Sequence, residues 1–223
     1  MKISSGAAKP KSYYAQQRPE LVALLPPALG SVLDLGCGAG GVGRGIRARA
    51  DRLVGVEVDR DAALLARDVY DEVLVGPIED RLAALDERFD TILAYDVLEH
   101  LADPASVLDR LHAVSAPGTL LHVSVPNARH FSLVRDLVLR GTFGYTEWGH
   151  RDITHLRWLT RRDLADLLEA AGWTVERTVH PPLSPAGRVA ERLTRGVSAE
   201  FLVHQWSALA RDGGPGVRPA STL

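Results

Sequence analysis

The sequence predicts an α/β fold in which helices cover both faces of a mostly parallel sheet. Short apolar runs alternate with helical patterns along most of the 223 residues, and runs such as "FDTILAYD" are apolar on both faces. A hydrophobic content of 46% is sufficient for a sizeable core. Residues 127–159 interrupt the alternation, and this break predicts an insertion after the fifth strand.

The first five strands and the helices that connect them follow in a regular order. Apolar runs predict strands at residues 31–36, 52–58, 72–76, 89–96 and 118–126. Helical periodicity predicts helices at residues 45–50, 61–69 and 103–114. The last of these helices is expected to begin with Asp103 as N-cap and Pro104 in its first turn.

Further elements follow the insertion. We expect Thr160 to cap a helix that has Asp163 at its third position and ends at Gly172. Residues 173–180 and 200–211 predict two closing strands, which can pair as an antiparallel hairpin.

The ends of the chain differ from its centre. Residues 1–12 are rich in Lys, Ser, Gly and Ala, and residues 212–223 are rich in Gly and Pro, so neither segment has much to bury. We therefore expect a flexible N-terminus, one domain at residues 13–211 with the insertion at 127–159 on its substrate side, and a flexible tail.

The composition argues against several classes of protein. The 26 basic and 28 acidic residues give a net charge of −2, which provides no general attraction to nucleic acid or to an anionic membrane. The start "MKISSGAAKPKS" has no signal-peptide apolar run, and no apolar segment approaches the roughly 20 residues that span a bilayer. Cys37 is the single cysteine, so no intramolecular disulfide can form and a cytoplasmic location is expected.

A glycine cluster, "DLGCGAGG", follows the first predicted strand. Its glycines fit both the dinucleotide pattern G-x-G-x-x-G and the tighter G-x-G-x-G, and either pattern alone is weak evidence. Asp34 borders this loop, where its carboxylate would repel a pyrophosphate but favour a cationic ligand without phosphate, such as S-adenosylmethionine. Glu57 ends the second strand and can accept hydrogen bonds from ribose hydroxyls, a role that NAD and S-adenosylmethionine share.

Four motifs in order give the chain a family resemblance. "VLDLGCGAG", "VGVEVD", "FDTILAYDVLEHLADP" and "PGTLLHVSVPN" resemble a class I S-adenosylmethionine-dependent methyltransferase over residues 31–127. The start "YYAQQRPELVALLP" and the later "DITHLRWLT" resemble a branch that acts on sugars and other small metabolites. The resemblance implies a Rossmann-like, seven-stranded sheet with a reversed last hairpin.

The resemblance also implies which residues bind the cofactor. The residues that it implies around the glycine turn and at the end of the second strand are Asp34, Gly36, Cys37, Gly38, Gly40, Glu57 and Val58. It assigns the adenine side to Ile78 and Glu79, and the methionine side to Asp96 and Val97, although Pro77 stands where the family commonly has an acidic residue. In the N-terminal segment, Tyr13, Tyr14 and Arg18 are expected either to close over the cofactor or to pack as a surface helix.

The segment "GHRDITHLRW" in the insertion is rich in groups that hold or move protons. One hypothesis makes His150 or His155 a general base that Asp152 orients, with Arg151 or Arg157 binding the acceptor and Trp148 or Trp158 stacking on a ring. The alternative is that Thr154, His155 and Arg157 only hydrogen-bond the insertion to the sheet.

Other histidines complete the set of candidates. His100 follows Asp96 by four residues, so it can share a helical face with that residue and is a further candidate base. Four further histidines lie at predicted helix or strand positions and are expected to be structural or exposed: His112, His122, His180 and His204. No histidine–carboxylate set has the tight spacing of a zinc motif, so no metal site is expected.

Taken together, these patterns predict an S-adenosylmethionine-dependent methyltransferase that acts on a small-molecule acceptor. We expect O-methylation of a sugar-containing or secondary metabolite, by a monomer or homodimer that binds neither nucleic acid nor membrane. The alternatives are an N-methyltransferase acting on a small amine, a nicotinamide-dependent oxidoreductase, which Asp34 disfavours, and a non-catalytic partner protein with this fold.

Overall fold

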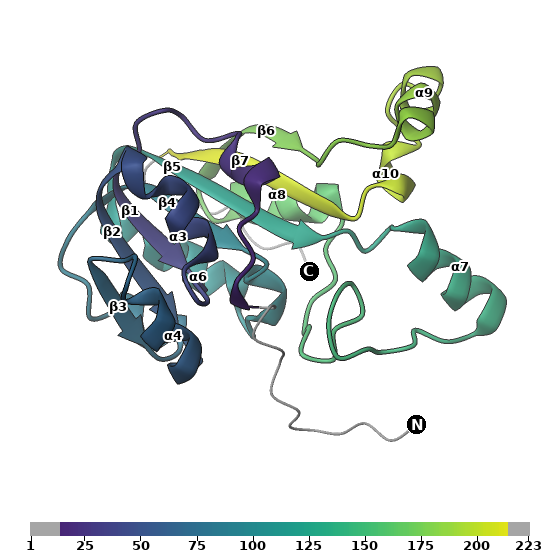
Figure 1. Cartoon of the computed structure of the whole chain (residues 1–223). Helices are drawn as coiled ribbons and strands as arrows, with labels where there is room; N and C mark the ends of the chain where they lie inside the picture. Colours follow the sequence, from purple (N-terminus) through teal and green to yellow (C-terminus); the bar gives the residue numbers. More distant parts are fainter. Residues whose placement is uncertain (1–13, 214–223) are drawn as a thin grey trace.

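A seven-stranded sheet forms the centre of the computed structural model, which describes residues 14–213. The strands in these residues are β1 (Gly30–Leu35), β2 (Ala50–Glu57), β3 (Glu72–Val75), β4 (Phe89–Tyr95), β5 (Ser115–Pro126), β6 (Trp173–Val179) and β7 (Gln205–Asp212). Their order is β3-β2-β1-β4-β5-β7-β6, and only the pairings of β7 with β5 and β6 are antiparallel (Figure 1). The predicted α/β class and the reversed last strand are therefore confirmed. Tyr13, the whole predicted flexible N-terminus (residues 1–12) and residues 214–223 of the predicted tail lie outside the described residues. Asp212, which was predicted to begin the tail, is the last residue of β7.

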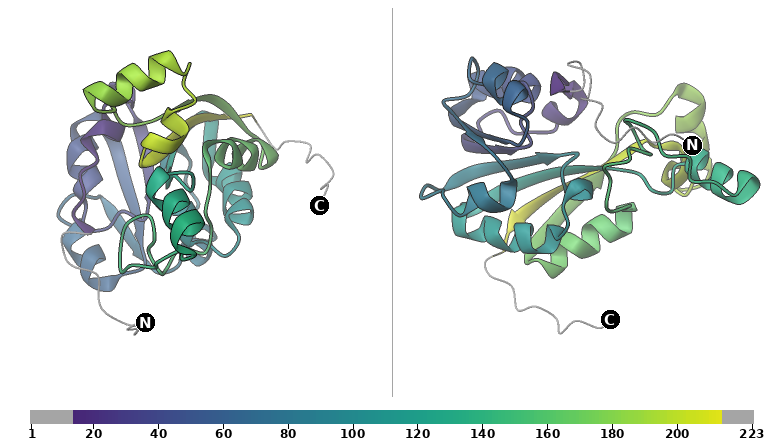
Figure 2. Two further views of the ribbon diagram at one scale, coloured as in Figure 1. Left: turned by 90° about the vertical axis from the view of Figure 1, so that its right-hand side faces the viewer. Right: turned by 90° about the horizontal axis from the view of Figure 1, so that it is seen from below.

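Helices cover both faces of this sheet, as the right-hand view of Figure 2 shows. One face carries α2 (Pro19–Val22), α3 (Gly41–Ile46) and α4 (Arg60–Ala66). The other carries α5 (Ile78–Leu82), α6 (Pro104–Leu111) and α8 (Arg161–Ala170). Short 3-10 turns follow α3, β4 and α6 at Arg47–Arg49, Leu98–His100 and His112–Val114.

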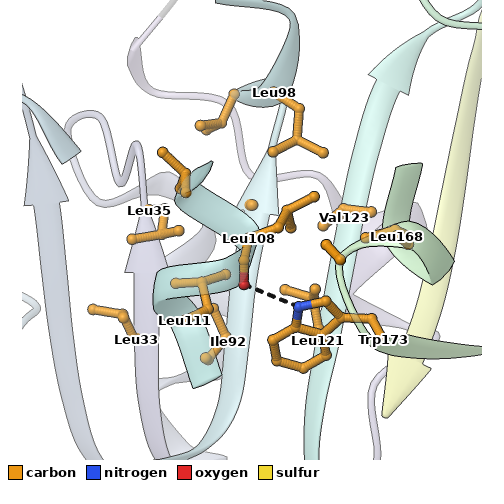
Figure 3. Close-up of a cluster of buried hydrophobic side chains, with 14 of the residues drawn as sticks. Leu33, Leu35, Ile92, Leu98, Leu108, Leu111, Leu121, Val123, Leu168 and Trp173 are labelled. Carbon is orange, nitrogen blue, oxygen red and sulfur yellow. Dashed lines mark hydrogen bonds between the residues drawn. The ribbon is translucent and has the colours of Figure 1, made fainter. Parts of the chain in front are cut away.

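The two faces are built from alternate residues of the same strands, because successive strand side chains point in opposite directions. In β1, Leu33 and Leu35 pack with α6 and α8, whereas Val32 packs with α2 and α3. Trp173 is buried in the same hydrophobic cluster as Leu33 and Leu35. Its Nε1 donates a hydrogen bond of 3.1 Å to the carbonyl oxygen of Leu108 (Figure 3). By the same alternation, Asp34 belongs to the α3 and α4 side.

The expected caps of α6 and α8 are present. The Asp103 side chain accepts a hydrogen bond from the Ser106 backbone, and Thr160 and Asp163 form a reciprocal capping box. The first predicted helix was placed too late, because α3 starts at Gly41 and Ala50 already belongs to β2.

The second closing strand is shorter than predicted. Residues 200–204 do not extend β7; part of them belongs to α10 (Ala199–Leu202), which follows α9 (Pro185–Leu193). The physical reason is that Ala199 and Val203, spaced one helical turn apart, pack on Trp206. The closing strands therefore pair as predicted, but a helical segment rather than a tight turn connects them.

Two segments extend beyond the carboxyl ends of β4 and β5. The predicted insertion contains α7 (Phe131–Arg140), and it lies beside the α9–α10 segment in Figure 1 and in the left-hand view of Figure 2. Asn127 joins the two segments, because its Nδ2 donates hydrogen bonds of 2.9 Å to the carbonyl oxygens of Glu200 and Val203. Among the described helices, none is both long and apolar enough to cross a bilayer.

Candidate active site

The glycine turn after β1 forms one wall of a large cavity. Gly36 and Gly38 have φ values of 72° and 55°, and both line the cavity. A Cβ on Gly36 would lie 2.8 Å from Val97 Cγ2, so this turn needs glycine for space as well as for conformation. Gly40 has a different role: it is the left-handed N-cap residue of α3, with φ 82°, and is not part of the cavity wall.

Two buried carboxylates lie beside this turn, as the sequence predicted. Asp34 and Glu57 are only 2% and 6% exposed. The Tyr70 hydroxyl donates a hydrogen bond to Asp34, and Glu57 accepts bonds of 2.8 Å from the backbone N–H groups of Gly38 and Asp59. These donors hold both acids in place at the cavity wall.

Burial changes the acidity of both carboxyl groups. It raises the pKa of Asp34 to about 7; the Tyr70 hydrogen bond opposes this shift and the charge of Glu57 adds to it. Burial also raises the pKa of Glu57, against the lowering effect of its backbone hydrogen bonds. A cationic ligand between them would relieve the electrostatic cost of two buried negative charges.

A polar network forms another part of the cavity wall, where β4 ends. Asp96 has a φ of 56°, unusual for a residue other than glycine, and it pairs with Arg18. The Gln205 amide donates to Asp96 Oδ1 and, at 3.0 Å, to Ser124 Oγ. The sequence predicted Asp96 and Arg18 at the site, but not Gln205.

The N-terminal segment crosses the glycine turn. The Tyr14 carbonyl oxygen accepts a hydrogen bond of 2.8 Å from the Ala39 N–H, and the Tyr14 hydroxyl donates a bond of 3.4 Å to Asp59. Tyr14 and Arg18 both line the cavity, which favours the expectation that this segment covers the cofactor.

The close approach of the Tyr14 backbone to Gly38 predicts that a methyl group added at Gly38 lowers stability and cofactor affinity. In a Gly38→Ala variant, the new Cβ would lie 2.5 Å from the Tyr14 carbonyl oxygen at a φ of 55°. The resulting strain and displacement, about 1–3 kcal/mol, are expected to lower the melting temperature and weaken cofactor binding about tenfold. Calorimetry and thermal melts check this. The control is Gly45→Ala on the exposed side of α3, where a Cβ meets nothing closer than 3.7 Å; equal effects of the two changes would contradict the prediction.

The cavity has a volume of about 1090 Å³ and joins the predicted cofactor residues to the insertion. Its wall includes the following predicted cofactor residues: Tyr14, Arg18, Asp34, Gly36, Cys37, Gly38, Glu57, Val58, Ile78, Glu79, Asp96 and Val97. It also includes all four predicted catalytic residues, namely His100, His150, Asp152 and His155, together with Trp148. Because small-molecule sites usually have about 300–1,000 Å³, this cavity has room for a cofactor and a small second ligand.

His100 is held at the cavity wall by the insertion. Its Nδ1 makes hydrogen bonds of 3.2 Å to the Thr154 carbonyl oxygen and 3.1 Å to Thr154 Oγ1. A carbonyl oxygen can only accept, so Nδ1 carries the proton and a neutral His100 has its lone pair on Nε2. Thr154 in turn donates bonds of 2.7 Å and 2.9 Å to Asp152 Oδ1, through its Oγ1 and its N–H. Asp152 thus holds Thr154 in position, and Thr154 orients the His100 ring.

The other residues of the insertion divide into two groups. Arg151 binds Asp136 Oδ2 at 2.6 Å, within the insertion, whereas Arg157 binds the Ala102 carbonyl oxygen at 2.5 Å and so connects the insertion to the segment after β4. Neither arginine is part of the cavity wall. Trp158 packs with the Phe143 and Tyr145 rings. His155 is buried, 3.9 Å from Glu99, and its ring meets that of His100 edge to face.

Two clusters of potential metal ligands occur in the described residues, although the sequence spacing indicated none. Glu99, His100 and His155 form one cluster, and His130, His150 and His204 form the other; within each, one potential ligand atom per residue lies within 4.8 Å of the others. His204 was expected on a strand, but it lies before β7 and lines the cavity. No local pattern could reveal these clusters because, apart from the adjacent Glu99 and His100, their members are far apart in the sequence.

The fold and the cavity together define the class of protein. The strand order reverses between β1 and β4, and the glycine turn, Glu57 and Asp96 lie at the carboxyl ends of β1, β2 and β4, where open α/β sheets bind ligands. Two buried acids beside a turn with no room for a Cβ fit a cationic, phosphate-free nucleoside cofactor. These features define a class I S-adenosylmethionine-dependent methyltransferase.

The chain belongs to the methyltransferase-domain family, whose model matches residues 9–178. It is 32% identical over 151 residues to a probable S-adenosylmethionine-dependent methyltransferase from Mycolicibacterium smegmatis, covering 66% of this chain and 53% of that protein. It is 31% identical over 160 residues to a ubiquinone biosynthesis O-methyltransferase from Hahella chejuensis, covering 64% of this chain and 66% of that protein. The chain thus spans between half and two thirds of the length of these two relatives.

Solved structures show the same fold at low sequence identity. A putative methyltransferase from Haloferax volcanii, in complex with the Trm112 methyltransferase activator, has a TM-score of 0.64 at 17% identity, covering 93% of this chain and 92% of that chain. A magnesium protoporphyrin IX methyltransferase from Synechocystis, with bound S-adenosylhomocysteine, has a TM-score of 0.60 at 17% identity, covering 90% of this chain and 82% of that chain.

Proposed function

We propose that this chain transfers the methyl group of S-adenosylmethionine to a hydroxyl group of a small molecule, in the class of sugar-containing or secondary metabolites. The observation that carries this proposal is His100, whose Nδ1 is held by Thr154 at the wall of a cavity that also contains the predicted cofactor residues. An O–H acceptor needs a base, and this orientation leaves Nε2 as the basic nitrogen. The name of the relative from Hahella chejuensis supports an oxygen acceptor.

The residues of the cavity wall would bind different parts of the cofactor. Glu57 would accept hydrogen bonds from the ribose hydroxyls, and Asp34 would place negative charge near the positive part of the cofactor. Asp96, with Gln205 and Arg18, would hold the amino-acid part of the cofactor.

The remaining step is the activation of the acceptor. When bound, S-adenosylmethionine supplies a methyl carbon that its sulfonium already activates. His100 Nε2 would take the proton of the acceptor hydroxyl while the oxygen bonds to this carbon. The carbon–sulfur bond would break in the same displacement, and S-adenosylhomocysteine would leave with the bonding electron pair. Thr154 and Asp152 would keep the imidazole oriented, and Trp148, at the cavity wall, would offer an apolar surface for a ring of the acceptor. The insertion would exclude water and align the two reactants.

A test of methyl transfer starts from the purified chain and isotope-labelled S-adenosylmethionine. Panels of phenols, catechols, sugars and small amines would be incubated with it, and labelled products identified by mass spectrometry. Label on oxygen supports the proposal, whereas label only on nitrogen would favour the amine alternative. Donor binding without any product would leave the non-catalytic alternative.

Glu57 gives a separate test of the cofactor site. A Glu57→Gln variant is expected to weaken binding of S-adenosylmethionine by about 1–3 kcal/mol, through lost charge-assisted hydrogen bonds. Calorimetry measures this change. Glu72→Gln is the matched control, because Glu72 pairs with Arg52 at the protein surface, outside the cavity wall. Unchanged affinity in the Glu57 variant would remove that residue from the site.

A further inference from the structure

We infer a transition-metal site formed by His130, His150 and His204, which nothing in the methyl-transfer proposal requires. One ring nitrogen from each residue lies within 4.8 Å of the other two. His130 precedes α7, His150 lies later in the insertion, and His204 precedes β7, so the two segments beyond the sheet meet at this point. We name these three residues the histidine triad.

The rings of the triad already lie close together. The His130 ring is stacked on both neighbours, with ring centroids 5.0 Å from His150 and 4.1 Å from His204. Tetrahedral zinc, with Zn–N distances of about 2.0–2.1 Å, places its nitrogen ligands roughly 3.3 Å apart. His204 is exposed, so rotation of its side chain can close the remaining gap.

The hydrogen bonds of the triad leave nitrogen lone pairs for an ion. His130 is 3% exposed; its Nδ1 lies 2.8 Å from Ser132 Oγ, and its buried Nε2 has no hydrogen-bond partner. His150 Nε2 bonds to the His204 carbonyl oxygen, so it must carry the proton and leave the lone pair on Nδ1. A bond from the second ring nitrogen to a carbonyl oxygen or hydroxyl is the usual way in which proteins orient histidine ligands.

The electrostatic surroundings also suit a cation. The nearby cation Arg151 is paired with Asp136 at 2.6 Å, which compensates its charge. Three neutral imidazoles select Zn²⁺ or a similar borderline ion such as Co²⁺ or Ni²⁺, rather than Mg²⁺ or Ca²⁺.

Three protein ligands leave one coordination position for another molecule, as in catalytic zinc sites. His150 and His204 line the cavity, so that position would face it. If methyl transfer is as proposed, on which this step alone rests, the ion would bind an oxygen atom of the acceptor. An acceptor with an anionic or readily deprotonated oxygen, such as a phenol or carboxylate, fits this position.

The test measures metal binding without donor or acceptor, so its outcome does not depend on methyl transfer. The full chain is first treated with a chelator, then titrated with ZnCl₂ by calorimetry and with CoCl₂ by visible absorption. The wild-type chain is expected to bind Zn²⁺ and to give the intense Co²⁺ bands of tetrahedral coordination. His204→Gln, at an exposed position, and His150→Gln are each expected to weaken Zn²⁺ binding at least about tenfold, as loss of a ligand implies.

Two controls locate the ion. His180→Gln changes a histidine outside both clusters and is expected to bind Zn²⁺ as the wild-type chain does. His100→Gln changes the other cluster and is expected to leave the triad signal intact. The inference is wrong if the wild-type chain binds no Zn²⁺. It is equally wrong if binding is unchanged in His204→Gln and His150→Gln, whether or not His100→Gln removes it.

Discussion

An Asp34→Asn variant is expected to bind S-adenosylmethionine at least about tenfold more weakly than the wild-type chain, while its unliganded form becomes more stable. The affinity falls because the buried carboxylate, which would attract the positive centre of the cofactor, is replaced by a neutral group of the same shape. Tyr70 can still donate its hydrogen bond to the Asn oxygen, so packing is preserved.

The gain in stability follows from the raised pKa of Asp34. Burial disfavours the charged form and raises the pKa of Asp34 from its ordinary value of 3.8 to about 7. Because the folded state binds this proton more tightly than the unfolded state, Asp34 contributes to the free energy of unfolding below pH 3.8. This contribution is lost as the pH rises towards 7. At pH 8 the carboxylate therefore lowers stability, by an amount on the order of a few kcal/mol. The Asn residue removes this cost.

Thermal melts and calorimetry across pH check both halves of this prediction. The stability advantage of Asp34→Asn is expected at pH 8 and is expected to shrink towards pH 4. The affinity of the wild-type chain for S-adenosylmethionine is expected to rise with pH through about 7, as Asp34 loses its proton. Asp51→Asn, at an exposed strand position, is the control and is expected to change neither quantity. Unchanged donor affinity in Asp34→Asn would contradict this role of the charge.

A His100→Gln variant is expected to lower kcat by about 10²–10⁴-fold, the usual contribution of a general base, and to leave donor affinity within about twofold of wild type. Glutamine can keep a hydrogen bond to Thr154 but has no basic nitrogen. Single-turnover rates with an identified hydroxyl acceptor measure the chemical step, and calorimetry measures donor binding.

Two further variants separate chemistry from positioning. Thr154→Val removes the hydroxyl that joins His100 to Asp152, so it is expected to lower kcat by a smaller factor than His100→Gln and to change the pH profile. His180→Gln is the control, because His180 binds Glu191 away from the cavity. Wild-type turnover in the His100 variant would assign the base to another residue, with His150 and His155 next to be changed.

The sequence could predict that the proposed cofactor residues meet at one cavity, because the signals are local. The glycine turn, Asp34 and Glu57 each adjoin a strand end, and parallel strands bring such ends to one edge of the sheet. The capping box at Thr160 is likewise local, since it depends on residues three positions apart. Local sequence patterns therefore predicted most of the residues that line this part of the cavity.

The acceptor side depends on how two long connections fold, and local patterns do not determine this. Gln205 and His204 reach the cavity only because β7 runs antiparallel between β5 and β6. His130 joins them because α7 begins beside that point. Local patterns also did not predict the separate contacts of "GHRDITHLRW": Arg151 binds α7 within the insertion, Arg157 binds the Ala102 carbonyl oxygen, and Thr154 binds His100.

The participation of Gln205 has a consequence for biosynthesis. Its amide meets Asp96 across 109 positions of sequence, and it opens the last strand of the sheet. If Gln205 helps to form the donor site as proposed, a nascent chain would lack part of that site until β7 has left the ribosome, even when β1 to β5 have already folded. Stabilisation by the donor, which grows with its concentration relative to Kd, is then available only to chains completed through β7. Cellular donor levels would thus help to protect finished molecules, but not stalled ones, from proteolysis.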